Sequence, residues 1–159
     1  MNNTELINII NIMPGIRYKE LQRITKMANG TLSYNIDILE KNGALKIKRD
    51  AGATRLYPIT MDENTINIIS ILRDESRLKI VKYLLKKKYA TYPELQKVIK
   101  KSFSTLTWHL DKMIDAGIIS VNNTIGMNEY NIINESLISD IIKKYIDIVN
   151  NFIDVWSTL

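Results

Sequence analysis

The sequence predicts a mainly α-helical chain with small β-hairpins, an α+β fold in which one structural unit occurs twice. Three observations support this. Apolar residues recur at helical spacing, as Leu32, Ile36 and Leu39 do within residues 27–43. Two such segments are followed by short stretches that alternate apolar and polar residues around a glycine-containing turn. Finally, the residues from Tyr18 onward match, without a gap, those from Tyr92 onward, a shift of 74 positions.

The internal repeat preserves both the apolar stripe and the glycine that ends the helix. The pairs identical at this shift are Glu20/Glu94, Leu21/Leu95, Gln22/Gln96, Lys26/Lys100, Thr31/Thr105, Leu32/Leu106, Asp37/Asp111 and Gly43/Gly117. Units of roughly 60 to 75 residues are near the lower end of independently folding size. We therefore predict a domain over residues 1–60, a second over 61–134 and a C-terminal helix over 135–159.

In the first unit, residues 4–13 and 18–25 are expected to be helices, the first ended by Pro14-Gly15. Residues 27–43 form the third helix. Its usual capping residue is missing, because Ala28 stands where the second unit has Ser102, at a cost of about 1 kcal/mol. A hairpin of residues 45–49 and 54–57 follows and places cations on its outward side, which are Lys46, Lys48, Arg49 and Arg55.

In the second unit, residues 61–72 and 77–88 are predicted helices, and Thr91 to Glu94 has the pattern of a capping box before a further helix. Ser102 caps the helix that Gly117 ends. The hairpin over 118–133 has turn residues Asn122, Asn123 and Gly126 but contains no Lys or Arg. Residues 135–159 carry a nearly heptad apolar stripe with more surface than one small domain covers.

Composition excludes several kinds of site. The 159 residues contain no cysteine and one histidine, so disulfides, thiolate metal sites and cysteine nucleophiles are ruled out, and we expect no metal and no cofactor. No phosphate loop or nucleophile with an orienting base is present, which places an enzyme last among the functions. The chain has neither a signal-type leader nor an apolar run of about 20 residues, so we expect a soluble, cytoplasmic protein.

The net charge of +5 is unevenly distributed. Residues 1–60 carry nine Lys or Arg against five Asp or Glu, residues 61–133 carry eleven against eight, and residues 134–159 carry two against four. The positive excess therefore lies on the two repeats, where a polyanion would bind. Charge alone leaves a merely solvated basic surface as an equal alternative.

The helices at 18–25 and 27–43 have the arrangement of a helix-turn-helix, whose second helix buries one stripe and offers short polar side chains to the DNA major groove. The repeat places a second such helix at 103–116. The candidate DNA-binding residues are Asn29, Thr31, Ser33, Tyr34, Asn35, Lys48, Arg49 and Arg55 in the first unit and Ser102, Ser104, Thr107, Trp108, His109 and Lys112 in the second.

The motifs Gly15 to Leu21, Asn29 to Asn35, Leu39 to Gly43 and Thr54 to Pro58 resemble those of archaeal winged helix-turn-helix regulators built as two tandem winged helices. The second half, through residues 71–81, 102–110 and Ala116-Gly117, resembles the arsenical-resistance repressor (ArsR) type. This resemblance implies that the third helices and the hairpins, or wings, contact DNA and that the helices flanking the second motif pair two subunits. Metal sensing is not carried over, because the cysteines it needs are absent.

The expected function is therefore that of a sequence-specific double-stranded DNA-binding transcription regulator that acts as a homodimer through residues 135–159 and 61–72. A small-molecule effector is neither identified nor excluded. The alternative is a winged-helix protein-interaction module, which salt-sensitive binding to duplex DNA would distinguish. The expected dimer interface is the apolar stripe made of Ile141, Tyr145, Ile148, Phe152 and Trp156.

Overall fold

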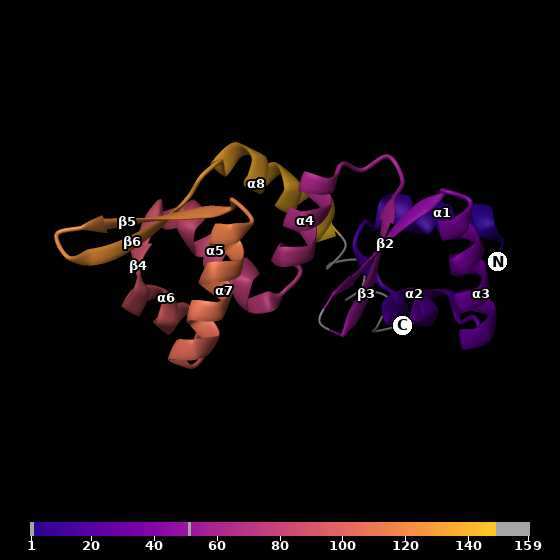
Figure 1. Cartoon of the computed structure of the whole chain (residues 1–159), viewed down its shortest axis with the longest axis horizontal. Coiled ribbons are helices and arrows are strands. Elements are labelled where there is room, and N and C mark those ends of the chain that lie inside the picture. The colour runs from indigo at the N-terminus through magenta and orange to yellow at the C-terminus, as the bar shows by residue number, and fades with distance from the viewer. Residues whose placement is uncertain (1, 51, 149–159) are drawn as a thin grey trace. The chain divides into compact units, whose positions relative to one another are not determined.

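The computed structural model describes residues 2–50 and 52–148 (Figure 1). The chain divides into two compact units: unit 1 holds the residues up to Ile66 together with the segment that begins at Lys144, and unit 2 is Asn67–Lys143. The α+β class predicted from the sequence is confirmed, with helices around two small antiparallel sheets. Among the described helices, none is long and apolar enough to cross a membrane.

Among its described residues, unit 1 contains three complete helices and a three-stranded sheet with the strand order β1-β3-β2. Its core is formed by apolar residues that the helices and the sheet turn toward one another, among them Leu6, Leu21, Leu32 and Leu56, all fully buried. The elements are α1 (Asn3–Ile12), β1 (Ile16–Arg17), α2 (Tyr18–Thr25), α3 (Asn29–Lys41), β2 (Leu45–Asp50) and β3 (Ala53–Pro58).

The third helix of unit 1, predicted over residues 27–43, is α3, Asn29–Lys41, in the structure. Ala28 precedes α3 and provides no side-chain cap. Leu32, Ile36 and Leu39 form the buried stripe of α3. The helix ends before Gly43, whose φ of +69° lies in the left-handed region that glycine adopts without strain.

Unit 2 repeats this order of helices and strands, and its sheet has the order β4-β6-β5. Leu106 and Leu110 are buried in α7 (Phe103–Asp115), the helix that corresponds to α3, as are Leu32 and Ile36 at the equivalent positions of α3. The elements, starting with a helix that spans the division between the units, are α4 (Glu63–Leu72), α5 (Glu75–Lys87), β4 (Tyr89–Thr91), α6 (Tyr92–Ile99), α7 (Phe103–Asp115), β5 (Ile119–Thr124), β6 (Met127–Ile132) and α8 (Glu135–Ile141).

Three of the helix starts in unit 2 are capped by side chains. At the start of α8, Asn134 accepts a hydrogen bond from the Leu137 amide at 3.1 Å. Asp74 accepts a hydrogen bond from the Arg77 amide at 3.0 Å, and Ser102 accepts one from the Thr105 amide at 3.3 Å, as predicted for Ser102. The capping box predicted at Thr91 is wrong. The hydroxyl of Thr91 instead donates to the Glu94 carboxylate at 3.2 Å, so it makes no bond to the backbone amides of α6.

The C-terminal segment is helical as far as it is described, but it is not one regular α-helix. Helix α8 passes into a π-helix, η1 (Ile142–Asp147). Ile138, Ile141, Ile142 and Ile146 are buried within the chain itself. The predicted helical stripe continues to Phe152 and Trp156, which lie outside the described residues.

Candidate nucleic-acid interface

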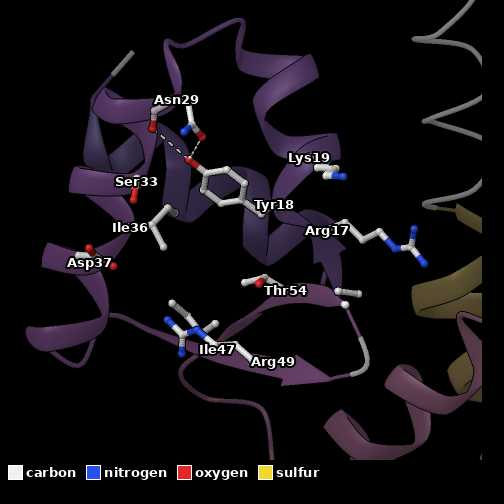
Figure 2. Close-up of a pocket in the computed structure, with 12 residues that line it drawn as sticks. Arg17, Tyr18, Lys19, Asn29, Ser33, Ile36, Asp37, Ile47, Arg49 and Thr54 are labelled. Carbon is white, nitrogen blue, oxygen red and sulfur yellow. Dashed lines mark hydrogen bonds between the residues drawn. The ribbon is translucent and has the colours of Figure 1, made fainter.

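A groove of about 370 Å³ lies in unit 1 between α3, the start of α2 and the β2–β3 hairpin (Figure 2). We call it the α3 groove. Its lining combines a small apolar floor with polar and charged side chains. The residues are Arg17, Tyr18, Lys19, Asn29, Ser33, Ile36, Asp37, Ile47, Arg49, Gly52, Ala53 and Thr54.

Tyr18 connects the two helices of the helix-turn-helix. Its hydroxyl lies 3.0 Å from the carbonyl oxygen of Asn29 and 2.9 Å from the side-chain oxygen of Asn29, and it donates to both (Figure 2). Burial, and after it the negative charge of Asp37, raises the pKa of Tyr18, so the hydroxyl stays protonated and remains a donor. This contact holds the first turn of α3 and the carboxamide of Asn29 in place.

Three cations line the α3 groove from two separate parts of the chain. Arg17 and Lys19 flank Tyr18, and Arg49 comes from β2. In Figure 2 the side chains of Arg17 and Lys19 extend away from the ring of Tyr18. Arg49 lies 3.6 Å from the Glu40 carboxylate, but both side chains are exposed, so this pair contributes little to stability. The sequence prediction included Arg49 and missed Arg17 and Lys19.

The outer face of α3 carries the predicted base-reading side chains. Asn29, Thr31, Ser33 and Tyr34 are exposed, and Asn35 is half-buried. Tyr34 leaves 66% of its surface uncovered, which is unusual for so large an aromatic side chain. Of these residues, Asn29 and Ser33 also line the α3 groove together with its cations.

Two of the four hairpin cations donate hydrogen bonds to backbone carbonyl groups of neighbouring segments. The ammonium group of Lys46 donates to the Met61 carbonyl at 2.8 Å. The guanidinium of Arg55 donates to the Gly15 carbonyl at 2.9 Å and so links β3 to the start of β1. The outward placement predicted for Lys46 and Arg55 is therefore wrong, because both side chains reach across to neighbouring backbone. Lys48 is half-buried, and Arg49 is exposed.

Unit 2 contains an equivalent groove of about 350 Å³, the α7 groove. At the shift of 74 positions, six of its residues occupy the places of α3-groove residues, but no cation lines it among the described residues. The Tyr92 hydroxyl donates to the Phe103 carbonyl at 2.7 Å, as Tyr18 does to Asn29. The lining residues are Tyr92, Phe103, Thr107, Leu110, Asp111, Asn128 and Tyr130.

The exposed face of α7 includes Trp108, which is 48% exposed. The guanidinium of Arg77 lies 5.5 Å from the centre of the Trp108 ring, and the ammonium of Lys112 lies 4.9 Å from it, both within cation–π range. Ser102 and Ser104 are exposed at the start of the helix, whereas Thr107 is half-buried against the Tyr92 hydroxyl at 2.9 Å.

His109 does not lie on this face. It is 4% exposed, with its Nε2 3.9 Å from a carboxylate oxygen of Asp74, and its buried Nδ1 has no hydrogen-bond partner among the described residues. The prediction that His109 contacts DNA is therefore wrong. The position follows from the helix itself, because His109 falls three residues after Leu106 and four before Met113, on the buried stripe of α7.

The burial of His109 gives unit 2 a pH-dependent stability. Burial lowers the pKa of His109 below its ordinary value of 6.5, the neighbouring Asp74 opposes this shift, and Arg77 adds to it. The unfolded chain therefore binds the proton more readily, and stability falls as the pH drops from 6.5 toward the folded pKa. We expect the Tm of the parent to decline more steeply over this range than that of His109→Gln. Parallel Tm profiles of the two proteins would contradict this role.

Comparison with known proteins agrees with the fold of unit 2. Residues 73–120 match the family model described as winged helix-turn-helix DNA-binding. An uncharacterised HTH-type transcriptional regulator of Methanocaldococcus jannaschii is 29% identical over 140 residues, which cover 87% of this chain and 35% of that protein. The chain thus spans about a third of the length of this relative.

Two solved structures show more distant likeness. The transcriptional repressor BigR of Xylella fastidiosa is 21% identical, with a TM-score of 0.42, over 48% of this chain and 81% of that one. A conserved hypothetical protein of Chlorobium tepidum is 17% identical, with a TM-score of 0.34, over 89% of this chain and 97% of that one. The segment that the family model matches, residues 73–120, runs from just before α5 to the first residues of β5.

Proposed function

We propose that this protein is a transcription regulator that binds double-stranded DNA in a sequence-specific manner. The observation that carries the proposal is the α3 groove, where Arg17, Lys19 and Arg49 adjoin the exposed polar face of α3. With α3 in the major groove, one sugar–phosphate strand passes between the helix and the hairpin, along these cations. The carboxylate of Asp37, which also lines the groove, disfavours a phosphate beside it, so the phosphate contacts form at the three cations.

Base reading in this proposal depends on Asn29 and Ser33. The side-chain oxygen of Asn29 already accepts a hydrogen bond from Tyr18, so the amide NH₂ group is the part that is left to donate. It can donate to acceptors on the major-groove edge, such as the N7 of a purine. Because the Tyr18 contact fixes the carboxamide before DNA arrives, less conformational freedom is lost on binding.

Unit 2 is proposed to contact DNA through α7, supported by its match to the DNA-binding family model. The side chains available are Ser102, Ser104 and Trp108, with Lys112 stacked on the Trp108 ring. Thr107 takes part through its hydroxyl, which is also hydrogen-bonded to the hydroxyl of Tyr92. No cation among the described residues lines the α7 groove, so the phosphate contacts of this unit come from the helix rather than from the hairpin.

We also propose that the regulator acts as a homodimer through its C-terminal segment. Ile148 is 54% exposed in the single chain and supports this placement, whereas Ile141 is already buried by its own chain. The proposed interface therefore begins at Tyr145 and includes Phe152 and Trp156. Sedimentation equilibrium should give about twice the chain mass of 18.4 kDa, and a single-chain mass at micromolar concentration would contradict the dimer.

The function is tested by selection from a random duplex pool, followed by titration of the selected duplex over a range of salt concentrations. A sequence-specific regulator enriches a common sequence, and its affinity falls with salt by about 0.9 logarithmic units per phosphate contact. A protein-interaction module, the second class of function considered, would enrich no sequence and show no such slope. That outcome would refute the proposal.

A further inference from the structure

The tip of the second hairpin carries an unusual residue. The pair Thr124 and Met127 closes a two-residue turn made of Ile125 and Gly126, whose φ values are +54° and +72°. Turns of this kind favour Asn or Gly at both positions, because both need positive φ. Ile125 is instead β-branched, and its side chain is 100% exposed. An apolar residue is therefore held in a strained conformation where it contacts nothing in its own unit.

The hairpin that carries Ile125 lacks the features of a phosphate-binding wing. Residues 118–133 contain no Lys or Arg and a single acid, Glu129. The exposed apolar side chains of its strands are Val121 and Met127. Figure 1 shows β5 and β6 extending well past the helices of unit 2, so the tip stands clear of the domain. At the equivalent position of the repeat, the first unit has Ala51 before Gly52.

We propose that Ile125 is an apolar wedge that enters the minor groove of the DNA bound by unit 2 and opens a base step. The proposal rests on the proposed function. Apolar side chains that bind in this way partly unstack neighbouring bases and bend the duplex, and they need no positive charge on the element that carries them. Strain that persists at an exposed tip is typical of a functional site, since no packing of the free protein rewards it.

The size and shape of the tip favour DNA over a protein partner. A stable protein interface buries about 800 Å² on each side, much more than one isoleucine at a two-residue turn provides. Val121 and Met127 do not join Ile125 in one apolar patch. The pairings Val121–Tyr130 and Thr124–Met127 place Val121 and Met127 on opposite faces of the hairpin. A narrow hairpin tip fits the minor groove, which is about 6 Å wide, and pyrimidine–purine steps unstack most easily.

The test uses the full chain and a set of selected duplexes that carry 2-aminopurine at successive positions. Unstacking of this base raises its fluorescence. We expect the parent to raise the signal at one position beside the α7 contact, most strongly at a pyrimidine–purine step. The variant Ile125→Asn should lose this increase and bind about tenfold more weakly, whereas Ile125→Leu, which keeps an apolar tip, should retain most of both.

Stability provides the second readout. Asn tolerates the left-handed conformation, so Ile125→Asn should raise the Tm, by roughly 4–8 °C for a unit of this size. If Ile125 had only a structural role, the same variant would not combine a higher Tm with weaker DNA binding. The matched control is Val121→Thr, which changes an exposed apolar residue of the same hairpin away from the tip and should leave the fluorescence signal unchanged.

Each outcome decides a different point. A parent that binds duplex with a normal salt slope but never raises 2-aminopurine fluorescence overturns the wedge and leaves the proposed function intact. Equal DNA binding by the parent and Ile125→Asn also overturns it. A parent that binds no duplex overturns the proposed function, and the wedge with it.

Discussion

Replacement of Arg17, Lys19 and Arg49 by alanine should cause the largest loss of DNA binding of any set of surface changes in this protein. If each side chain makes one phosphate contact, the slope of log affinity against log salt should decrease by about 2.7. At about 1 kcal/mol for each lost contact, affinity at low salt should fall on the order of a hundredfold. A fluorescence anisotropy titration of the selected duplex at several salt concentrations measures both quantities.

A charge-matched control separates the groove from general charge. Arg23, Lys41 and Lys79 are exposed and lie outside the lining of the α3 groove, so their replacement by alanine removes the same net charge elsewhere. We expect this control to change the slope of log affinity against log salt by less than about 0.9, the value for one phosphate contact. An equal loss in the two triple variants would mean that the α3 groove has no special part in binding.

The largest loss of stability is expected from Leu32→Ala and from its counterpart in the repeat, Leu106→Ala. Both leucines are fully buried in the apolar stripes of their helices. Removing three carbon atoms and leaving a partly collapsed cavity should lower the free energy of unfolding by about 2–5 kcal/mol in each case. Urea unfolding followed by far-ultraviolet circular dichroism measures the change.

The neighbouring exposed residue supplies the control for this pair. Thr31→Ala alters the same turn of α3 on its outer side and should change the free energy of unfolding by about 0.5 kcal/mol or less. An unchanged midpoint for Leu32→Ala would show that the stripe of α3 does not form the core. The assignment of the opposite side of α3 to DNA would then lose its basis.

Much of the fold could be predicted because its signals are local. The spacing of Leu32, Ile36 and Leu39 indicated α3, and Gly43 and Gly117 marked where the third helix of each unit ends. The short strands β1 and β4 were not predicted. They contain two and three residues and exist only because they pair with β3 and β6, far away in the sequence.

The candidate site was only partly predictable, because it combines distant segments. Arg17 and Lys19 gave no signal by themselves. They belong to the α3 groove because strand β1 pairs with β3 and so brings Arg17 opposite Arg55. Lys46 and Arg55 were wrongly predicted to face outward. The alternating pattern of the strands places them on the outer side, but their long side chains reach carbonyl groups of neighbouring loops. His109 could have been recognised as buried from its spacing to Leu106 and Met113.

The most direct test of the central claim, that α3 lies in the major groove with a DNA strand along the α3 groove, is tethered cleavage of the selected duplex. The chain contains no cysteine, so Ser33→Cys provides a single attachment point for an iron–EDTA reagent on the outer face of α3. The matched control is Asn11→Cys on the exposed side of α1. This placement of α3 predicts cleavage confined to a few nucleotides within the selected sequence for Ser33→Cys and none above background for Asn11→Cys. Equal or absent cleavage from the two positions, with DNA binding intact, would contradict it.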